Sequence, residues 1–299
     1  MNRTSMDSHI ETLSEHASFG GVQGFYRFDS AAIGLPMRFG VYRPAQAMRA
    51  DAPPMPALIY LAGLTCNEET FAIKAGAQRL ASELGLVLVT PDTSPRHTGV
   101  EGADAAWDFG TAAGFYIDAT QAPWARHWRM ESHITQDLPP LLAAHFGVDL
   151  RRLGVCGHSM GGHGALTLAL KHPALFRSVS ALAPIAAPMQ CPWGVKAFTG
   201  YLGNDRADPA DPANPANWAA HDATALVQAG RRTAPILIDQ GEADKFLAEQ
   251  LHPNLFEAAC RDAGQALTLR RHPGHDHGYY FIASFIDDHL RHHAAALGA

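Results

Sequence analysis

The sequence predicts a single α/β domain with a mostly parallel central sheet and helices on both faces. Short apolar segments without period-2 alternation are typical of strands that are buried on both faces. Helical patterns alternate with these segments, as in an open sheet with right-handed crossovers. The strand-like segments are 57–61, 86–89, 153–156, 235–238 and 266–271, and the helical patterns cover 68–84, 135–146, 162–172 and 246–263. Before them, residues 24–44 alternate apolar and polar side chains around a Gly-Leu-Pro turn, which predicts an antiparallel N-terminal strand pair.

The domain limits follow from where these patterns begin. Residues 1–17 are largely polar, so we expect an N-terminal tail there, with residues 18–299 forming one domain. Three prolines fall among Ala, Asp and Asn in residues 205–218, where they prevent a regular helix. That segment is predicted to be an excursion on the surface.

The composition is that of an ordinary soluble protein. The 299 residues are 47% hydrophobic and 17% charged, which provides for a sizeable core. A formal charge of -6 gives no electrostatic reason to expect a nucleic-acid or membrane partner, because such partners need a clustered positive surface. No segment reaches the roughly 18 to 20 apolar residues of a spanning helix, and residues 1–18 do not resemble a signal peptide. Four widely spaced cysteines indicate free thiols and favour the cytoplasm: Cys66, Cys156, Cys191 and Cys260.

The segment Gly157-His158-Ser159-Met160-Gly161 matches the G-x-S-x-G pattern of a nucleophilic serine. It follows a predicted buried strand and precedes a predicted helix, which is the context in which this pattern carries meaning. The turn holds its serine in strained backbone geometry, and side chains at either glycine would crowd the strand–helix contact. Ser159 is therefore the predicted nucleophile of an α/β-hydrolase fold.

A serine hydroxyl needs a general base, and that base needs a buried carboxylate to orient it. In this fold the acid follows a late strand, where Asp239, Glu242 and Asp244 are candidates. We favour Asp244 because it lies beyond the turn at Gly241, whereas Asp239 is expected to be a structural residue at the strand end.

The base is expected after the last strand, where residues 272–277 contain three histidines. His277 directly precedes the closing helical pattern, so it is the predicted base, with His275 as the alternative. Together with Asp276 these histidines could also suggest a metal site. The turn has no helical ligand spacing and serine chemistry needs no metal, so we expect neither a metal nor a cofactor.

An oxyanion hole needs backbone N–H donors that point at the developing negative charge. One donor is expected from Met160, the residue after the nucleophile. The loop after strand 57–61 is expected to supply the other, and Leu64 is the predicted donor.

Between about residues 14 and 293 the chain resembles the S-formylglutathione hydrolase family, also called esterase D. Three departures from the family pattern concern the pocket: Gly278 stands where a serine usually follows the catalytic histidine, residues 97–99 replace a glycine-led stretch, and residues 205–218 are unusually rich in Ala and Pro. The segments that carry the resemblance are Ser18-Phe19-Gly20-Gly21, Gly63-Leu64-Thr65-Cys66, Lys74-Ala75-Gly76-Ala77-Gln78, Pro91-Asp92-Thr93-Ser94-Pro95-Arg96, Trp107-Asp108-Phe109-Gly110-Thr111, 157–166, Cys191-Pro192-Trp193-Gly194 and 281–293.

The resemblance implies a cytosolic homodimer that hydrolyses S-formylglutathione to glutathione and formate without a cofactor. It places the family's catalytic triad on Ser159, Asp244 and His277, and its oxyanion donors on Leu64 and Met160. A cysteine near the active site falls on Cys66, and Trp193 and Lys196 are further candidates for the substrate pocket. The alternatives are a general carboxylesterase acting on small esters, an acyltransferase and an inactive scaffold; the intact triad set argues against the scaffold.

Overall fold

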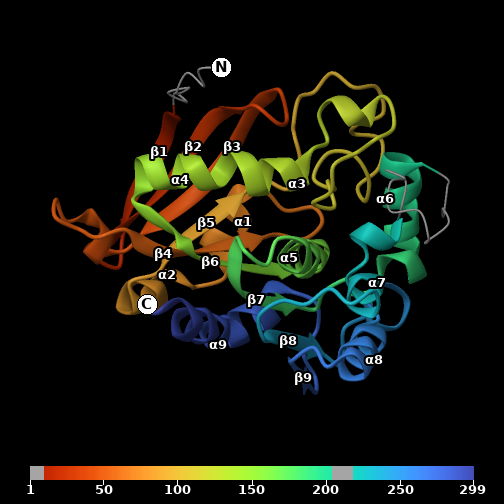
Figure 1. Ribbon diagram of the computed structural model, residues 1–299. Coiled ribbons are helices and arrows are strands. Elements are labelled where there is room, and N and C mark those ends of the chain that lie inside the picture. The colour runs from red at the N-terminus through yellow and green to blue at the C-terminus, as the bar shows by residue number, and fades with distance from the viewer. Residues whose placement is uncertain (1–9, 204–217) are drawn as a thin grey trace.

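The computed structural model describes residues 10–203 and 218–299, and within them one sheet of nine strands organises the chain. The strand order is β1-β2-β3-β5-β4-β6-β7-β8-β9 (Figure 1). All pairs from β5 to β9 are parallel, and β1, β2 and β3 join them through antiparallel pairs. The strands are β1 (Ile10–Ser18), β2 (Gly21–Ser30), β3 (Leu35–Arg43), β4 (Met55–Leu61), β5 (Val87–Pro91), β6 (Val148–His158), β7 (Phe176–Leu182), β8 (Ile236–Gly241) and β9 (Leu267–His272).

This sheet confirms the predicted mostly parallel architecture and the antiparallel pair β2 and β3, but the predicted tail is wrong from Ile10 onwards. Residues 10–18 form β1, which pairs with β2 along the edge of the sheet. Its side chains are largely solvated, and its acidic residues bind polar groups of β2; for example, Tyr26 Oη donates to Glu15 at 2.6 Å. A polar sequence was thus compatible with a strand because edge strands need no apolar face towards solvent. Residues 1–9 and most of the predicted excursion at 205–218 lie outside the described residues.

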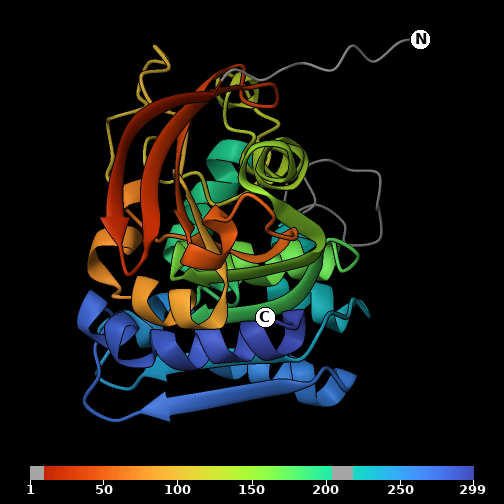
Figure 2. The ribbon, with the colours of Figure 1, turned by 90° about the vertical axis from the view of Figure 1, so that its left-hand side faces the viewer.

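Helices cover both faces of the sheet. Figure 1 shows α4 and α5 on one side and α2 and α9 on the other, and Figure 2 shows that the two edges of the twisted sheet run in different directions. The α-helices are α1 (Glu68–Lys74), α2 (Gln78–Leu84), α3 (Met130–Ser132), α4 (Leu138–Phe146), α5 (Met160–Lys171), α6 (Pro192–Leu202), α7 (Ala223–Gln228), α8 (Pro253–Ala263) and α9 (Tyr279–Leu297). Shorter helical turns are η1 (Ala45–Met48), η2 (Trp124–Arg126), η3 (His133–Asp137), η4 (Pro188–Gln190), η5 (Trp218–His221) and η6 (Leu247–Leu251).

Two predicted helical patterns are interrupted in the structure. The pattern at 68–84 divides into α1 and α2 around Gly76, whose φ of 71° only glycine adopts readily. The pattern at 246–263 divides into η6 and α8 at His252, which precedes Pro253 and also has a positive φ. A proline disfavours helical geometry in the residue before it, so this break has a local cause.

A polar seam joins α9 to the sheet; it consists of Ser178, Ser180, Asp239, His289 and His293. His289 contacts Asp239 Oδ2 through Nε2 at 3.1 Å and Ser180 Oγ through Nδ1 at 2.8 Å. The ring of His293 bridges Ser180 Oγ at 2.8 Å and Ser178 Oγ at 2.6 Å. The two serines lie on β7, a strand that the sequence patterns did not identify, and their hydroxyls are satisfied inside the protein by α9.

Several histidines are buried where a charge is costly. His163 is fully buried between the rings of Phe115 and Phe198, and this burial lowers its pKa to about 3. Burial, together with the nearby Lys171 charge, lowers the pKa of His221 to about 4. Both side chains are therefore neutral in the folded protein at pH 7.

We predict that stability falls as the pH falls from about 6.5 to 5. Because the folded-state pKa of His163 lies below the unfolded value of about 6.5, the unfolded chain binds the extra proton in this range. Each such histidine lowers the free energy of unfolding by up to about 1.4 kcal/mol per pH unit. Chemical denaturation at several pH values measures how steeply the free energy of unfolding depends on pH. This dependence should be weaker in His163→Leu and unchanged in the exposed control His16→Gln. An unchanged pH dependence in His163→Leu would mean that His163 titrates alike in both states.

Candidate active site

The turn between β6 and α5 holds Ser159 in a strained backbone conformation. Its φ is 56° and its ψ is -118°, a region that side chains other than glycine rarely occupy. Ser159 N donates to Leu182 O at 3.0 Å, and Ile185 N donates to Ser159 O at 3.1 Å. The end of β7 and the loop after it therefore hold the serine backbone on both sides.

The two glycines of the pattern are required by close backbone contacts. A Cβ on Gly157 would lie 2.0 Å from Gly161 O, and a Cβ on Gly161 would lie 1.9 Å from Leu61 O. Neither distance is possible for real atoms, and the obstructing atoms are backbone, which cannot move aside cheaply. The local sequence thus folds as a tight turn because α5 packs directly against the ends of β6 and β4.

The loop after β4 lies against this turn. A Cβ on Gly63 would be 3.0 Å from Ser159 Cβ, so the segment that continues to Leu64 passes beside the serine. Met160 is the first residue of α5, and the first N–H groups of a helix have no acceptor within the helix. The structure therefore brings together the two segments that were predicted to supply N–H donors.

Asp244 and His277 form a close pair. His277 Nδ1 lies 2.5 Å from Asp244 Oδ2, and the carboxylate is fully buried. Asp244 Oδ1 also accepts the Phe246 backbone N–H at 2.8 Å. These hydrogen bonds fix the carboxylate, which in turn fixes the orientation of the imidazole.

Other hydrogen bonds hold the loop that carries His277. Ala243 N donates to His275 O at 3.0 Å, and Glu242 N donates to His272 O at 3.0 Å. A Cβ on Gly241 would lie 2.4 Å from His275 O, so the turn after β8 and the loop after β9 are in direct contact. This contact places the predicted acid and the predicted base on adjoining segments.

The alternative acid, Asp239, has other partners. Arg270 binds both of its carboxylate oxygens, at 2.5 and 2.6 Å, and His272 and His289 complete its contacts. Burial alone would raise the pKa of Asp239, but hydrogen bonds from His289, Arg270 and His272 hold it well below its usual range. Asp239 therefore joins β8 to β9 and α9, as expected of a structural residue.

The ring of the alternative base, His275, has aromatic neighbours. Its ring packs against the rings of Phe281 and Phe285, with centroid distances of 6.0 and 4.9 Å. The other alternative acid, Glu242, is exposed. Among these candidates the structure pairs only Asp244 with His277.

His158 forms a wall of the site that sequence reasoning did not identify. Its ring centroid lies 4.4 Å from that of His277, and the side chain is buried. Burial, and then the neighbouring His277, keep the pKa of His158 well below its usual value, so it is a neutral group there. The position directly before the nucleophile was the available signal, because β6 must deliver that residue to the same strand end.

Aromatic side chains also lie next to His277. Phe246 lies edge-on to its ring at 5.1 Å, and Trp193 packs on Phe246 at 4.7 Å. Trp107, which is 58% exposed, packs on Trp193 at 5.6 Å. The Phe246 ring thus separates the predicted pocket residue Trp193 from the His277 imidazole. Lys196, one helical turn further along α6, forms an ion pair with Asp108.

Cys66 lies in the loop that passes beside Ser159. Its carbonyl accepts hydrogen bonds from Thr93 Oγ1 at 2.6 Å and from Arg96 Nη2 at 3.1 Å. Burial raises the pKa of its thiol, although the Tyr279 hydroxyl and other nearby groups oppose this shift. None of the four cysteines, all of which are described, forms a disulfide, so the predicted free thiols are confirmed.

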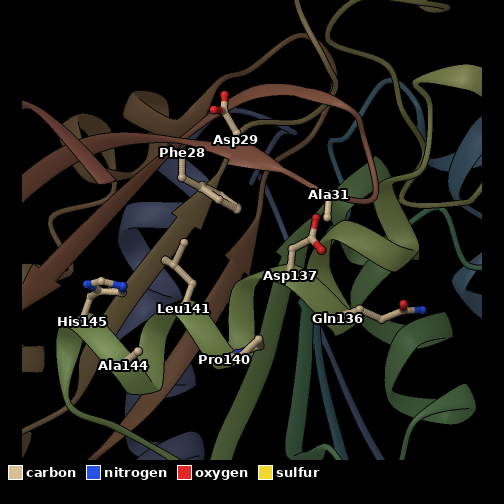
Figure 3. Close-up of a pocket in the computed structure, with 9 residues that line it drawn as sticks. All are labelled: Phe28, Asp29, Ala31, Gln136, Asp137, Pro140, Leu141, Ala144 and His145. Carbon is tan, nitrogen blue, oxygen red and sulfur yellow. The ribbon is translucent and has the colours of Figure 1, made fainter. Parts of the chain in front are cut away.

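A separate hollow of about 350 Å³ lies between β2 and α4 (Figure 3). Phe28 from β2 and Leu141 from α4 face one another in it, and Asp29, Asp137 and His145 supply polar groups. Asp137 is already engaged, since its carboxylate accepts hydrogen bonds from Ser30 Oγ and Ala32 N. The hollow contains none of the predicted catalytic side chains, so it is distinct from the candidate active site.

Sequence comparisons relate this chain to known esterases. A family model described as "Putative esterase" matches residues 30–292. The S-formylglutathione hydrolase of Rattus norvegicus is 48% identical over 292 residues, which covers 97% of this chain and 99% of the relative. The enzyme of the same name from Mus musculus is 49% identical over the same coverage.

Structural comparisons agree with the sequence matches. A solved S-formylglutathione hydrolase from Agrobacterium tumefaciens has a TM-score of 0.90 and 46% identity, with 96% of this chain and 100% of that chain covered. A ferulic acid esterase from Anaeromyces mucronatus has a TM-score of 0.64 at 18% identity, covering 99% and 95% of the two chains. At that identity the likeness concerns the fold alone, and the match to the Agrobacterium tumefaciens enzyme confirms the predicted hydrolase architecture.

Proposed function

The chain belongs to the S-formylglutathione hydrolase family of esterases, and we propose on that premise that it hydrolyses S-formylglutathione to glutathione and formate through a formyl-serine intermediate. The observation that carries the mechanism is the hydrogen bond between Asp244 and His277 beside the strained Ser159 turn. A buried carboxylate, an imidazole and a serine on a strained strand–helix turn are the components of the catalytic triad of serine hydrolases. No step of the reaction requires a cofactor.

In the proposed acylation, Ser159 Oγ attacks the formyl carbon while His277 Nε2 takes the hydroxyl proton. Asp244 accepts a hydrogen bond from His277 Nδ1–H, which selects the tautomer that leaves Nε2 free as a base. The imidazolium that forms is stabilised by the same buried carboxylate. The proximity of the two groups is supported by His158, which precedes Ser159 and lies 4.4 Å, ring to ring, from His277.

The tetrahedral intermediate carries a negative oxygen, and we assign its stabilisation to the backbone N–H groups of Leu64 and Met160. Removal of one such donor typically costs about 3 to 4 kcal/mol of transition-state stabilisation. The intermediate then collapses to formyl-Ser159 and releases glutathione. Because a thiolate is a good leaving group, proton donation by His277 matters less in this step than it would for an amine. Water, deprotonated by His277, then hydrolyses the formyl ester to formate.

Two further expectations remain proposals. Among residues 10–203 and 218–299, no helix combines the length and apolar character needed to cross a bilayer, and we propose that the enzyme works in the cytoplasm. We also propose that it forms a homodimer, as the family resemblance implies. Sedimentation equilibrium should give about twice the chain mass of 32.1 kDa, and a monomer over the working concentration range would contradict the dimer.

Substrate preference tests the thioesterase assignment. We predict that kcat/KM for S-formylglutathione exceeds that for a short p-nitrophenyl ester, since the thiol portion of the substrate contributes binding energy that the ester lacks. A preference for the ester would instead favour a general carboxylesterase. Ser159→Ala should abolish both activities without loss of the folded state, as circular dichroism would verify. Substantial residual turnover would mean that another nucleophile operates.

A pair of histidine variants tests the base. We predict that His277→Gln lowers kcat by about three to four orders of magnitude, because the hydroxyl then has no base. The matched control is His275→Gln, two residues earlier in the same loop, which should retain most of the activity since its ring contacts Phe281 and Phe285 instead. Steady-state kinetics at a fixed pH compares the two. Equal losses in both variants would indicate that the loop conformation, rather than the His277 imidazole, limits activity.

A further inference from the structure

Lysine is scarce in this chain, and its placement is uneven. The sequence contains only four lysines: Lys74, Lys171, Lys196 and Lys245. Two of them are neutralised by carboxylates, since Lys171 pairs with Glu131 and Lys196 pairs with Asp108. Lys74 and Lys245 are exposed and form no ion pair with any residue in 10–203 or 218–299. They are therefore the lysines available to bind an anion.

Lys245 lies beside the site on the Phe246 side. Its Nζ is 4.8 Å from the centroid of the Phe246 ring, which is itself 5.1 Å from the centroid of the His277 ring. The ammonium is thus no further from the imidazole than these two distances combined. Lys245 also follows Asp244 directly, so the hydrogen bonds that fix the Asp244 carboxylate fix the backbone from which Lys245 extends.

Lys74 is linked to the site through Tyr279 and His158. Its Nζ is 5.6 Å from the centroid of the Tyr279 ring, and that ring lies 6.5 Å from the ring of His158. Lys74 is the last residue of α1, and its charge also favours the thiolate form of Cys66, which lies in the loop beside Ser159. The two lysines therefore lie over different aromatic rings, Lys245 over Phe246, which contacts His277, and Lys74 over Tyr279, which contacts His158.

An aromatic face attracts an ammonium group but does not neutralise it as a carboxylate does. Each lysine is held near the site by its ring while it keeps a full positive charge for a ligand. The protein as a whole carries a formal charge of -6, which repels an anionic substrate unless local cations attract it. A flexible ammonium suits a solvated carboxylate, because it acts as a point charge without the fixed geometry of a guanidinium.

The thiol of the proposed substrate has the complementary chemistry. Glutathione carries one carboxylate on its glycine and another on its γ-glutamyl residue, one on each side of the cysteine. Since a residue spans at most about 3.3 to 3.6 Å, each carboxylate lies on the order of one or two residue lengths from the sulfur. With the thioester carbonyl at Ser159, the two carboxylates extend to different sides of the reacting centre.

We propose that Lys74 and Lys245 bind the two carboxylates of the glutathionyl group and so select acidic thioesters over neutral esters. This assignment rests on the proposed thioesterase function and extends it to the part of the substrate that does not react. Both lysines act on binding and steering, and neither takes part in bond making.

Charge-removing variants test the assignment. Lys74→Met and Lys245→Met keep the side-chain length and should each raise KM for S-formylglutathione about fivefold with little change in kcat. The ratio of kcat/KM for S-formylglutathione to that for p-nitrophenyl acetate should fall by a similar factor, and Lys→Arg variants should restore most of it. The salt dependence of kcat/KM for S-formylglutathione should weaken in the Met variants, because screening then has less attraction to remove. Glutathione, as an inhibitor of p-nitrophenyl acetate hydrolysis, should bind more weakly to them.

Arg151→Met is the matched control, because the substitution removes the same unit of charge at a highly exposed residue that pairs with Asp149. It should leave kcat/KM for both substrates unchanged. The lysine assignment would be overturned if the Met variants left the ratio of the two kcat/KM values unchanged. It would also be overturned if Arg151→Met lowered that ratio equally. Failure of the unmodified enzyme to hydrolyse S-formylglutathione would instead overturn the proposed function, and the assignment with it.

Discussion

Close packing around the backbone of Ser159 is the constraint on which the candidate site depends. A non-glycine residue at positive φ costs about 1 to 3 kcal/mol, and such a conformation persists only where the surroundings determine it. Here the surroundings are the ends of β4 and β7, which contact the turn through Leu61 O and Leu182 O. Ser159 can therefore keep this conformation only when β4 and β7 are paired on either side of β6. The candidate site thus forms together with the sheet.

Two aspartates divide the histidines of the C-terminal region between different tasks. Asp239, inside the sheet, binds His272 and His289 together with Arg270, and so anchors both β9 and α9. Asp244, five residues later and beyond the turn, binds His277. The loop that carries the proposed base thus connects β9 and α9, the two elements that Asp239 holds in place. We therefore expect the proposed base to need little reorganisation, a condition that favours efficient proton transfer.

Pattern reasoning reached the parts of the molecule where local sequence and structure agree. The Ser159 turn was predictable because its glycines are a steric necessity, and the buried parallel strands were predictable because both their faces are apolar. β1 was not, since a solvated edge strand has the composition of a tail. β7 escaped notice because Ser178 and Ser180 interrupt its apolar pattern and find partners only on α9, far away in sequence. The positions of His158 and Phe246 around His277 likewise arise from tertiary packing.

The seam beneath α9 also determines how that helix can dock. A purely apolar interface allows a helix to shift along its axis, because a ridge of apolar side chains fits the neighbouring groove almost as well. A displacement of α9 by one turn would remove His289 from Asp239 and His293 from the two serines, leaving buried groups without partners. Mis-registered assembly is thereby penalised, and Tyr279, at the helix start, arrives at one position beside His158. An amphipathic helix of equal hydrophobicity without these polar side chains would therefore not specify the docked position of α9.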